Sequence, residues 1–391
     1  MTRFEPRQLR TKMPVDNCRV CGGDFFEDPL LIYENMPKAA QYLPDAASLH
    51  LDRGVDLSVV QCSACGLVQL NNDPVPYYRE VIRAAGISKE MTDFRLAQFG
   101  QFVDKYALKE KKIIEIGCGY GEYLAILQQC DVVPFGLEFS ETAVRSCNSN
   151  GLKAIQGFIE SDTEKITDAP FDAFLILNFF EHLPNPNGTL AGLRRNLTDN
   201  AIGFVEVPNF DMILQKNLFA EFISDHLFYF TRETLTSTLS RNGFEVIECG
   251  QIWFDYIISA TVRKRKRLDI SIFQQHQEKL KSQIADYLSR FADQKVAIWG
   301  AGHQALAVIS LTDIGGKIKC VVDSAPFKQG KFTPASHVPI ISPEELYEAH
   351  IEAIIVMAAS YSDEVARIIR KNYPPGMQVA ILRDYGLKEL E

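Results

Sequence analysis

The sequence lacks a run of about 18 apolar residues, the minimum for a helix that spans a membrane. Its N-terminal stretch, MTRFEPRQLRTKMPVDN, also lacks the apolar core of a secretory signal peptide. A surplus of basic residues is missing too, because 41 Lys and Arg stand against 50 Asp and Glu, a formal net charge of −9. We therefore expect a cytoplasmic protein without a membrane span, and the acidic balance disfavours nucleic acid as a partner.

What is present is the composition of a folded protein. Hydrophobic residues make up 46% of the 391 positions and charged residues 23%, which suits globular domains with extensive cores. At about 150 residues per domain, this length predicts two or three domains. The nine cysteines are an odd number, which indicates a reducing compartment with metal-bound or free thiols rather than a disulfide framework.

Two Cys-x-x-Cys pairs form the strongest local signal. They are Cys18 with Cys21 and Cys62 with Cys65, and a glycine follows each pair. Four thiolates in this arrangement predict a closed, tetrahedral zinc site with a structural role, because no ligand position is left open for water. Residues 29–60, between the pairs, are expected to be mostly irregular, so zinc would supply the stability that they lack. Unrelated buried thiols or a redox Cys-x-x-Cys are the alternatives.

Strands and helices are expected to alternate in the middle of the chain. Apolar residues at near-helical spacing behind Ser88 predict a helix over 88–108. A strand, a glycine turn and a helix follow in KKIIEIGCGYGEYLAIL, and further strands are predicted at VVPFGLEFS, FDAFLILNF and AIGFVEVPN. Such alternation is typical of a parallel, doubly wound sheet. Further helices are predicted near residues 140–150, 187–197 and 231–242.

The last third of the chain repeats this pattern on a smaller scale. A basic run over 263–267, interpreted as a solvated hinge rather than a phosphate contact, precedes a predicted amphipathic helix over 270–291. The segments QKVAIWGAGHQALAVISL, KIKCVVDS and EAIIVMAA then predict another strand-turn-helix unit and two strands. We therefore predict the α/β class: a doubly wound, Rossmann-like core with an N-terminal zinc module and a second, small C-terminal α/β domain. The predicted boundaries are 1–86 for the zinc module, 87–266 for the core, and 267–391 for a linker helix and the last domain.

The first glycine turn has the features of a nucleotide-like cofactor site. Gly117, Gly119 and Gly121 directly follow an apolar strand, where missing side chains let a ligand approach the backbone at a helix N-terminus. Glu138 closes the next strand, twenty-one residues after Gly117, and an acid there accepts both ribose hydroxyls. Glu115 lies inside the first strand, where a carboxylate would repel the pyrophosphate of a dinucleotide and favour a cationic sulfonium.

The segments IIEIGCGYGEYL, GLEFS and LILNFFEHLPNP resemble three motifs of the class I S-adenosylmethionine-dependent methyltransferases. This resemblance implies that the glycine turn wraps the methionine part of S-adenosylmethionine, that Glu138 holds the ribose, and that residues 178–182 face the methyl group. The cofactor-binding residues expected on this basis are Glu115, Gly117, Gly119, Gly121, Glu138, Phe139 and Asn178.

Nearly the whole chain is similar to the three-domain sugar C-methyltransferases, which methylate a carbon of a nucleotide-activated keto-deoxysugar. The segments that carry this similarity are CSACGLVQL, DHLFYFT and VVDSAPFKQGKFTPASHVPIISPEEL. The chain departs from that family in three places. Ile223 stands at a tyrosine position ahead of Asp225 and His226, FDYIISATVRK replaces an HGGS-like segment, and Tyr77 and Tyr78 lie only near the aromatic site that follows the zinc module.

Methyl transfer needs an aligned donor and acceptor, and a base that removes one proton from the acceptor. Histidine is the side chain whose pKa lies nearest to neutrality. We predict His226 as the general base, with Asp225 or Glu181 orienting or polarising it, and His182 as a substrate contact or the base itself. A loop-capping role for His182 is the alternative. The expected acceptor is a small molecule, most simply a nucleotide sugar, and the expected assembly is a monomer or a weak homo-oligomer.

Other functions remain open at this point. They are O-methylation of a sugar or another small polar metabolite, methylation of a nucleic acid gripped by the zinc module, and a binding role that keeps the fold without the activity. Gly300 to Ala305, with Asp323 at the end of the next strand, loosely satisfy a dinucleotide pattern and offer an NAD site as a further alternative. The resemblance implies instead a degenerate Rossmann-like domain that helps to enclose the substrate.

Overall fold

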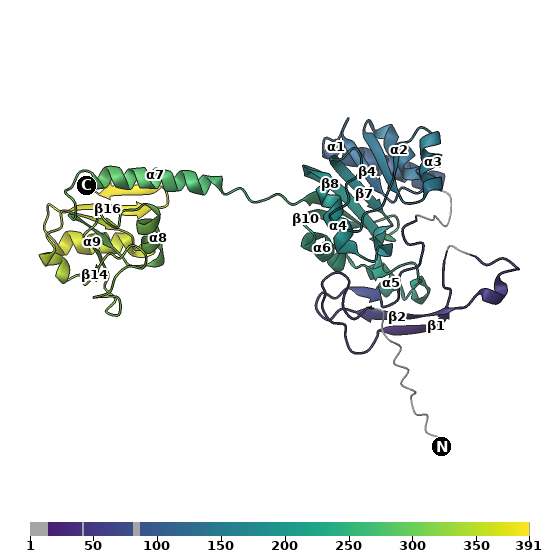
Figure 1. Cartoon of the computed structure of the whole chain (residues 1–391), viewed down its shortest axis with the longest axis horizontal. Helices are drawn as coiled ribbons and strands as arrows, with labels where there is room; N and C mark the ends of the chain where they lie inside the picture. Colours follow the sequence, from purple (N-terminus) through teal and green to yellow (C-terminus); the bar gives the residue numbers. More distant parts are fainter. Residues whose placement is uncertain (1–14, 41–42, 81–86, 391) are drawn as a thin grey trace, which may run out of the picture. The chain divides into compact units, whose positions relative to one another are not determined.

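The computed structural model describes residues 15–40, 43–80 and 87–390. The chain divides into two compact units, Met1–Lys266 and Arg267–Glu391 (Figure 1). The boundary predicted at residue 86 lies outside the described residues and stays a prediction. Within the described residues, no helix is long and apolar enough to cross a membrane.

A small antiparallel sheet in the order β1-β2-β3-β9 builds the N-terminal part of the first unit. Its strands are β1 (Leu31–Met36), β2 (Val55–Gln61), β3 (Val68–Leu70) and β9 (Phe228–Tyr229). β9 comes from much later in the chain, and its pairing with β3 fastens the cysteine-bearing module to the core. Leu57 and Leu70 of the module accordingly share one apolar cluster with Phe210 and Tyr229 of the core.

The prediction that residues 29–60 are mostly irregular is wrong at both ends of that stretch. β1 and β2 pair as antiparallel strands, with Leu31 opposite Val59. Leu57 and Val59 of β2 are fully buried, whereas Leu31 and Ile32 of β1 are exposed. Because β1 lacks a buried face, its sequence shows no alternation, and the pairing with β2 rather than local preference forms it.

The core of the first unit is a seven-stranded sheet in the order β10-β11-β8-β7-β4-β5-β6. The five strands from β8 to β6 are parallel, as the alternating pattern predicted. β10 and β11 form an antiparallel hairpin along one edge, and β11, which the sequence did not predict, pairs with β8. The strands are β4 (Lys112–Ile116), β5 (Val133–Glu138), β6 (Ala154–Gln156), β7 (Phe171–Leu177), β8 (Leu197–Pro208), β10 (Phe244–Ile252) and β11 (Ile257–Lys264).

Helices cover both faces of this sheet, which confirms the doubly wound core (Figure 1). The helices of the first unit are α1 (Lys89–Lys105), α2 (Glu122–Leu127), α3 (Glu141–Ser149), α4 (Pro186–Arg195), α5 (Phe210–Lys216) and α6 (Arg232–Arg241), with the short helices η1 (Leu49–Leu51), η2 (Gln128–Cys130), η3 (Phe180–His182) and η4 (Phe219–Glu221). α1 and α2 pack on one face, and α4 and α6 on the other.

α1 shows why these segments become helices. Ser88 caps it as predicted, because the Ser88 side chain accepts a hydrogen bond from the N–H of Met91. Phe99, Phe102 and Val103 recur at helical spacing and are buried against the sheet. Burial of each such side chain stabilises the fold by about 1.5–3 kcal/mol.

The second unit is a smaller α/β domain around a six-stranded sheet in the order β14-β13-β12-β15-β16-β17, which confirms the predicted C-terminal α/β domain. All neighbouring strands are parallel except β16 and β17. The strands are β12 (Val296–Trp299), β13 (Cys320–Val322), β14 (Ile340–Ile341), β15 (Ala353–Val356), β16 (Gln378–Arg383) and β17 (Gly386–Leu390), and the helices are α7 (Ser271–Leu288), α8 (His303–Leu311), α9 (Ser362–Asn372), η5 (Glu345–Glu348) and η6 (Ala359–Tyr361). α7 is the predicted amphipathic helix.

Candidate active site and metal centre

Four cysteine sulfurs meet in the N-terminal module. The Sγ atoms of Cys18, Cys21, Cys62 and Cys65 all lie within 4.8 Å of one another. Cys18 Sγ is 3.7 Å from Cys65 Sγ, and Cys21 Sγ is 3.4 Å from Cys62 Sγ. Four sulfurs bound tetrahedrally to one zinc ion at about 2.3 Å lie about 3.8 Å apart. The cluster is therefore compatible with a zinc ion held by four cysteines.

Two tight turns shape this cluster. Gly22 and Gly66 have φ angles of +72° and +75°, a left-handed conformation that glycine adopts without strain. The N–H of Gly23 donates to Cys21 Sγ over 3.3 Å, and the N–H of Ala64 donates to Cys62 Sγ over 3.4 Å. Such hydrogen bonds favour the thiolate, which is the form that binds metal. These turns explain the glycine that follows each cysteine pair.

The first glycine turn joins the end of β4 to α2. Gly117 has a φ angle of +74°, and a Cβ atom there would lie 2.5 Å from Phe179 Cδ1, so no other residue fits without rearrangement. The buried carboxylate of Glu138, at the end of β5, accepts the N–H of Gly119 and the N–H of Ser140, each over 2.9 Å. The glycine turn and the acid that the sequence paired are in direct contact.

A buried ion pair lies at the same ends of the parallel strands as the glycine turn. Arg95 on α1 is fully buried, and its Nη1 pairs with the carboxylate of Glu206 near the end of β8. Glu206 also accepts hydrogen bonds from Gln98 Nε2 over 2.6 Å and Ser259 Oγ over 2.9 Å. The Nε and Nη2 atoms of Arg95 are buried without a hydrogen-bond partner in the described part of the chain. The Tyr123 ring, at the start of α2, lies 4.9 Å from Arg95 Cζ.

Arg95 was not predicted from the sequence. A signal was available, because Arg95 lies four residues before Phe99 and therefore on the buried face of α1. A charged residue at such a position needs a buried partner or a ligand.

The other predicted cofactor residues surround the first glycine turn. Glu115 is buried within β4, and Phe139, directly after β5, is 41% exposed. Asn178 directly follows β7 in a left-handed conformation, with φ at +50°. Its Oδ1 atom is buried and has no hydrogen-bond partner within residues 15–40, 43–80 and 87–390. The glycine cradle and the orphaned groups of Arg95 and Asn178 fit a polar ligand that carries both donors and acceptors.

Two histidines and one carboxyl group gather just after β7. η3 contributes Glu181 and His182, and the segment before β9 contributes His226. The His182 and His226 rings lie 4.8 Å apart, centroid to centroid, and His182 Nε2 lies 3.9 Å from Glu181 Oε1. The structure therefore brings together three of the four side chains that the sequence predicted as catalytic.

Burial sets the protonation of this cluster. It lowers the pKa of His182, and it lowers the pKa of His226 well below the ordinary value, with a further contribution from the neighbouring His182. It also raises the pKa of Glu181 to about 8. At neutral pH both imidazoles therefore keep a free lone pair, and the Glu181 carboxyl group is mainly uncharged.

Asp225 contacts other groups than the predicted one. Its carboxylate accepts the Tyr77 hydroxyl over 2.8 Å and the N–H of Ala40 over 2.9 Å. Its backbone carbonyl accepts a hydrogen bond from His182 Nδ1 over 2.8 Å. No hydrogen bond between its carboxylate and His226 occurs among the residues that the structure describes. Asp225 therefore orients His182 and fastens the cysteine module to the core.

Tyr77 and Tyr78 differ in what they contact. Tyr77 reaches the histidine cluster through Asp225, whereas the Tyr78 hydroxyl donates to Glu160. A cavity of about 730 Å³ opens beside Tyr77 in the same unit, and Lys38 and Arg53 are among the residues that line it. Cavities of this size accommodate ligands as large as a nucleotide.

The second glycine turn, after β12, contains a different arrangement. Asp323, directly after β13, accepts the N–H of Ala301 over 2.8 Å and the N–H of Ala325 over 2.9 Å. Lys328 Nζ lies 2.9 Å from the same carboxylate. Burial opposes ionisation of Asp323, but Lys328 and the two N–H groups outweigh it and lower the pKa. A ribose would have to displace this ammonium group, so the turn suits a dinucleotide poorly.

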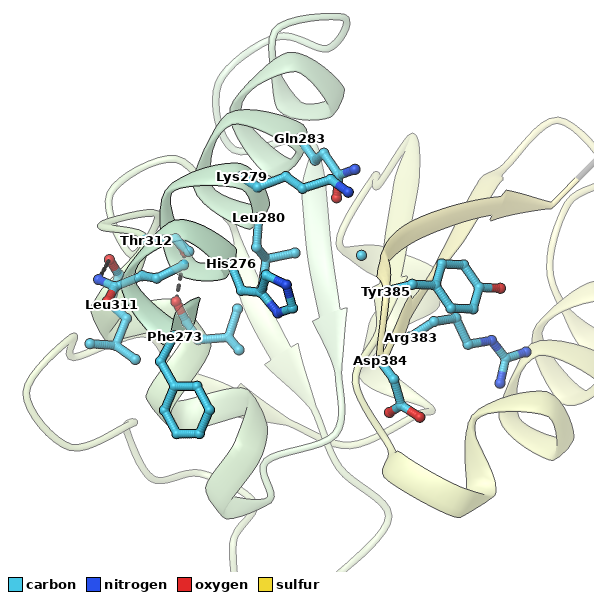
Figure 2. Close-up of a pocket in the computed structure, with 13 residues that line it drawn as sticks. Phe273, His276, Lys279, Leu280, Gln283, Leu311, Thr312, Arg383, Asp384 and Tyr385 are labelled. Carbon is cyan, nitrogen blue, oxygen red and sulfur yellow. Dashed lines mark hydrogen bonds between the residues drawn. The ribbon is translucent and has the colours of Figure 1, made fainter. Parts of the chain in front are cut away.

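The second unit also contains a cavity of about 630 Å³, shown in Figure 2. His276 and Lys279 of α7 line it on one side, and Arg383 and Tyr385, at the turn between β16 and β17, line it on the other. Arg383 is already paired with Asp363, Nη1 to Oδ2 over 3.1 Å. This cavity could not be predicted from the sequence, because its two sides are about a hundred residues apart in the chain.

Comparison with known families gives two matches. Residues 88–249 match a family model described as a methyltransferase domain, and residues 264–381 match one described as a C-methyltransferase C-terminal domain. The two domains define the class of the chain, which is an S-adenosylmethionine-dependent methyltransferase. This confirms the class that the sequence motifs predicted.

Among curated proteins, C-methyltransferase NovU of Streptomyces niveus is 25% identical over 391 aligned residues, which cover 90% of this chain and 91% of NovU. Ubiquinone biosynthesis O-methyltransferase of Pasteurella multocida is 22% identical over 134 residues, or 31% of this chain and 54% of that protein. A solved S-adenosylmethionine-dependent methyltransferase from Aquifex aeolicus is 17% identical, with 44% of this chain and 93% of that one covered at a TM-score of 0.35. The chain is thus similar, over most of its length, to methyltransferases with a C-methyltransferase C-terminal domain.

Proposed function

We propose that the enzyme transfers a methyl group to a carbon beside a carbonyl of a nucleotide-activated keto-deoxysugar, with His226 as the general base. The observation that carries this proposal is the cluster of Glu181, His182 and His226 just after β7, which Asp225 and Tyr77 connect to the cysteine module. The relative named C-methyltransferase NovU supports carbon as the acceptor atom. The sugar nucleotide follows from the resemblance of the three-domain sequence to the sugar C-methyltransferases.

The residues around the first glycine turn would hold S-adenosylmethionine, whose sulfonium provides an electrophilic methyl group. Glu138 would accept hydrogen bonds from the ribose hydroxyls, and the ring of Phe139 would pack against the adenine. The unsatisfied Nε and Nη2 atoms of Arg95 would donate to the methionine carboxylate. Buried Glu115 would favour the positive charge of the cofactor.

The base would act on the acceptor carbon as follows. A neutral His226 ring nitrogen takes the proton from the carbon beside the carbonyl, and the C–H electron pair forms an enolate. The enolate carbon then bonds to the methyl group, and the electrons of the broken S–CH₃ bond stay on sulfur. Mainly uncharged Glu181 does not repel the enolate, and its proton is available as a hydrogen-bond donor. His182, which the Asp225 carbonyl holds in place, packs against the acceptor and positions it.

The acceptor would extend from this cluster toward the cavity beside Tyr77. That cavity of about 730 Å³ has Lys38 and Arg53 in its lining, which provide positive charge for a diphosphate. The zinc ion would have a structural role, because all four ligand positions are taken by Cys18, Cys21, Cys62 and Cys65.

The test uses full-length protein with methyl-labelled S-adenosylmethionine and three acceptor pools: nucleoside-diphosphate keto-deoxysugars, nucleoside-diphosphate sugars without a keto group, and RNA. We expect label transfer to the keto-deoxysugar pool only, with the new methyl on carbon by NMR. Label on oxygen would favour the O-methyltransferase alternative. Cofactor binding without any label transfer would contradict an enzymatic role on these acceptors.

A further inference from the structure

We propose that Glu181, His182 and His226 form a second metal site, distinct from the four-cysteine cluster, that binds one first-row transition-metal ion and thereby inhibits methyl transfer. Binding of the ion is inferred from geometry alone. Inhibition rests on the proposed function, because it assumes that His226 is the base.

The three ligand groups already converge. One carboxylate oxygen of Glu181 and one ring nitrogen from each of His182 and His226 lie within 4.8 Å of one another. His182 Nε2 and Glu181 Oε1 are 3.9 Å apart. Ligand atoms at about 2.0–2.2 Å from one ion lie about 3.0–3.5 Å from each other. The groups therefore need to move by less than about 1 Å each to close on an ion.

Glu181 independently indicates a missing partner. Its side chain is 1% exposed, and its Oε2 atom has no hydrogen-bond partner within the described residues. A carboxyl oxygen buried in this way loses its contacts with water and gains none from the protein. A metal ion bound by the Glu181 carboxylate would compensate for this loss, and the other oxygen of the same group, Oε1, lies 3.9 Å from His182 Nε2.

His182 has the tautomer that a metal ligand requires. Its Nδ1 lies 2.8 Å from the backbone carbonyl of Asp225, which can only accept, so the ring proton is on Nδ1 and the lone pair is on Nε2. Nε2 is also the ring atom that faces Glu181. A backbone carbonyl that holds the second ring nitrogen is the usual support of a metal-binding histidine. Asp225 is in turn fixed by Tyr77 and Ala40.

The donor set selects the class of ion. Two imidazole nitrogens and one carboxylate oxygen suit Zn²⁺, Co²⁺ or Ni²⁺, whereas Mg²⁺ and Ca²⁺ prefer oxygen ligands alone. Three protein ligands leave at least one position for water or for an oxygen atom of the acceptor. The thiolates of the N-terminal cluster prefer zinc, so the two sites are separable by their chemistry.

An ion bound at this site would slow methyl transfer. Coordination takes the lone pair of His226, which then cannot accept the proton of the acceptor carbon. The ion and the acceptor compete for the same pocket, whereas the first glycine turn is untouched. An added ion should therefore raise the apparent KM for the acceptor and leave the affinity for S-adenosylhomocysteine unchanged.

The test titrates Co²⁺ into full-length protein that retains its structural zinc and contains neither cofactor nor acceptor. Calorimetry and visible absorption should give one additional Co²⁺ per chain, without the charge-transfer bands of cobalt bound to thiolate. Glu181→Gln and His226→Gln should each weaken this binding at least tenfold. Glu221→Gln and His276→Gln are the matched controls, because they remove a carboxylate and an imidazole elsewhere, and they should bind Co²⁺ like the parent.

Four results would overturn the site: no additional ion at millimolar Co²⁺, thiolate bands, equal loss of binding in a control, or unchanged binding in whichever of the two ligand variants keeps the parent's melting temperature. A methyl-transfer rate that rises with added Co²⁺ would overturn the inhibitory role. Because binding is measured without substrates, it stands or falls separately from the proposed base. Failure of the proposed function would appear instead as full methyl transfer by His226→Gln.

Discussion

The chain contains two strand-turn-helix units with closely similar sequence patterns, and their surroundings differ. In both units a glycine turn follows a buried strand, and an acid directly at the end of the next strand accepts an N–H from the turn: Glu138 from Gly119, and Asp323 from Ala301. The second acid, however, is also bound to the Lys328 ammonium group. The local motif is therefore shared, whereas the charge around the acid is not.

The neighbouring side chains differ even more. The first turn lies beside Asn178 and Phe179, and the segment that continues from them contains Glu181 and His182. At the second turn the corresponding strand is β15, and Met357 and Ala358 follow it directly. A Cβ atom on Gly300 would lie 2.6 Å from the backbone oxygen of Met357. A glycine turn with an acid indicates a nucleotide-like site only when the adjoining strands bring suitable groups to it.

The largest effect is expected from removing the zinc ion proposed for the cysteine module, a change confined to the first unit. Cys62→Ser, or prolonged chelation, should unfold this module, because structural zinc contributes about 10–16 kcal/mol in small metal-dependent folds. The Ala40 and Tyr77 contacts to Asp225 would be lost with it. Hydrogen exchange should show new exposure over residues 15–80 and none over 296–356. Unchanged protection of β2 would contradict the four-cysteine assignment.

The next largest effect is expected from His226→Gln. Loss of a general base lowers kcat by about 10²–10⁴-fold, while the affinity for S-adenosylhomocysteine should stay within twofold of the parent value. The matched control is His303→Gln, which changes the first residue of α8 at the second turn and should leave kcat unchanged. Steady-state kinetics and calorimetry check both. A comparable loss in the control would remove the distinction between the two turns.

Glu138→Gln and Asp323→Asn compare the two acids directly. Hydrogen bonds to a charged group contribute about 1.5–3 kcal/mol, so Glu138→Gln should weaken S-adenosylhomocysteine binding by about 10–150-fold. Asp323→Asn should leave it unchanged. Both constants come from the same calorimetric titration. Equal weakening by the two substitutions would show that the second turn also serves the cofactor.

A smaller effect is expected in acid. The folded-state pKa of Asp323 is lowered, so the stability that it contributes is present above its ordinary pKa and is lost as the pH falls through the lowered value. The denaturant concentration at the unfolding midpoint of the second unit should therefore decrease as the pH is lowered from about 5 to about 3, and Asp323→Asn should reduce this decrease. Fluorescence of Trp299, which pairs with Val322 directly before Asp323, follows this unit. An identical decrease of the midpoint in the variant would contradict a stabilising ion pair.

The smallest effect is expected from Lys328→Met. Removing the ammonium group leaves Asp323 without its ion-pair partner. Among the described residues, however, no cluster like that of Glu181, His182 and His226 lies at the second turn. NAD should therefore remain unbound at millimolar concentration by calorimetry. Binding of NAD by this variant, and not by the parent, would mean that Lys328 alone keeps a dinucleotide out.

Much of the fold could be predicted because it depends on local periodicity. Ser88 and the apolar spacing behind it placed α1, and the glycine turns marked the start of both Rossmann-like domains. β1 could not be predicted, because Leu31 and Ile32 are exposed and the strand depends on its partner. β11 was missed because a hairpin along the edge of a parallel sheet has no signal in the alternation of strands and helices.

The candidate site divides in the same way. Residues within one motif, such as Gly117 and Gly119, or Glu181 and His182, could be named from the sequence. Contacts across the chain could not: Tyr77 meets Asp225 across 148 positions, and Arg95 meets Glu206 across 111. Such contacts arise only when the sheet is assembled, so no spacing in the sequence encodes them.

Proton exchange at the acceptor carbon tests the central proposal most directly. The protein is incubated in D₂O with S-adenosylhomocysteine and a nucleoside-diphosphate keto-deoxysugar, and NMR follows loss of the proton beside the carbonyl. Because methyl transfer cannot occur under these conditions, the signal reports the base alone. The parent protein should exchange this proton for deuterium, and His226→Gln should reduce the rate at least a hundredfold while S-adenosylhomocysteine still binds. Equal exchange by the parent and His226→Gln would contradict His226 as the base.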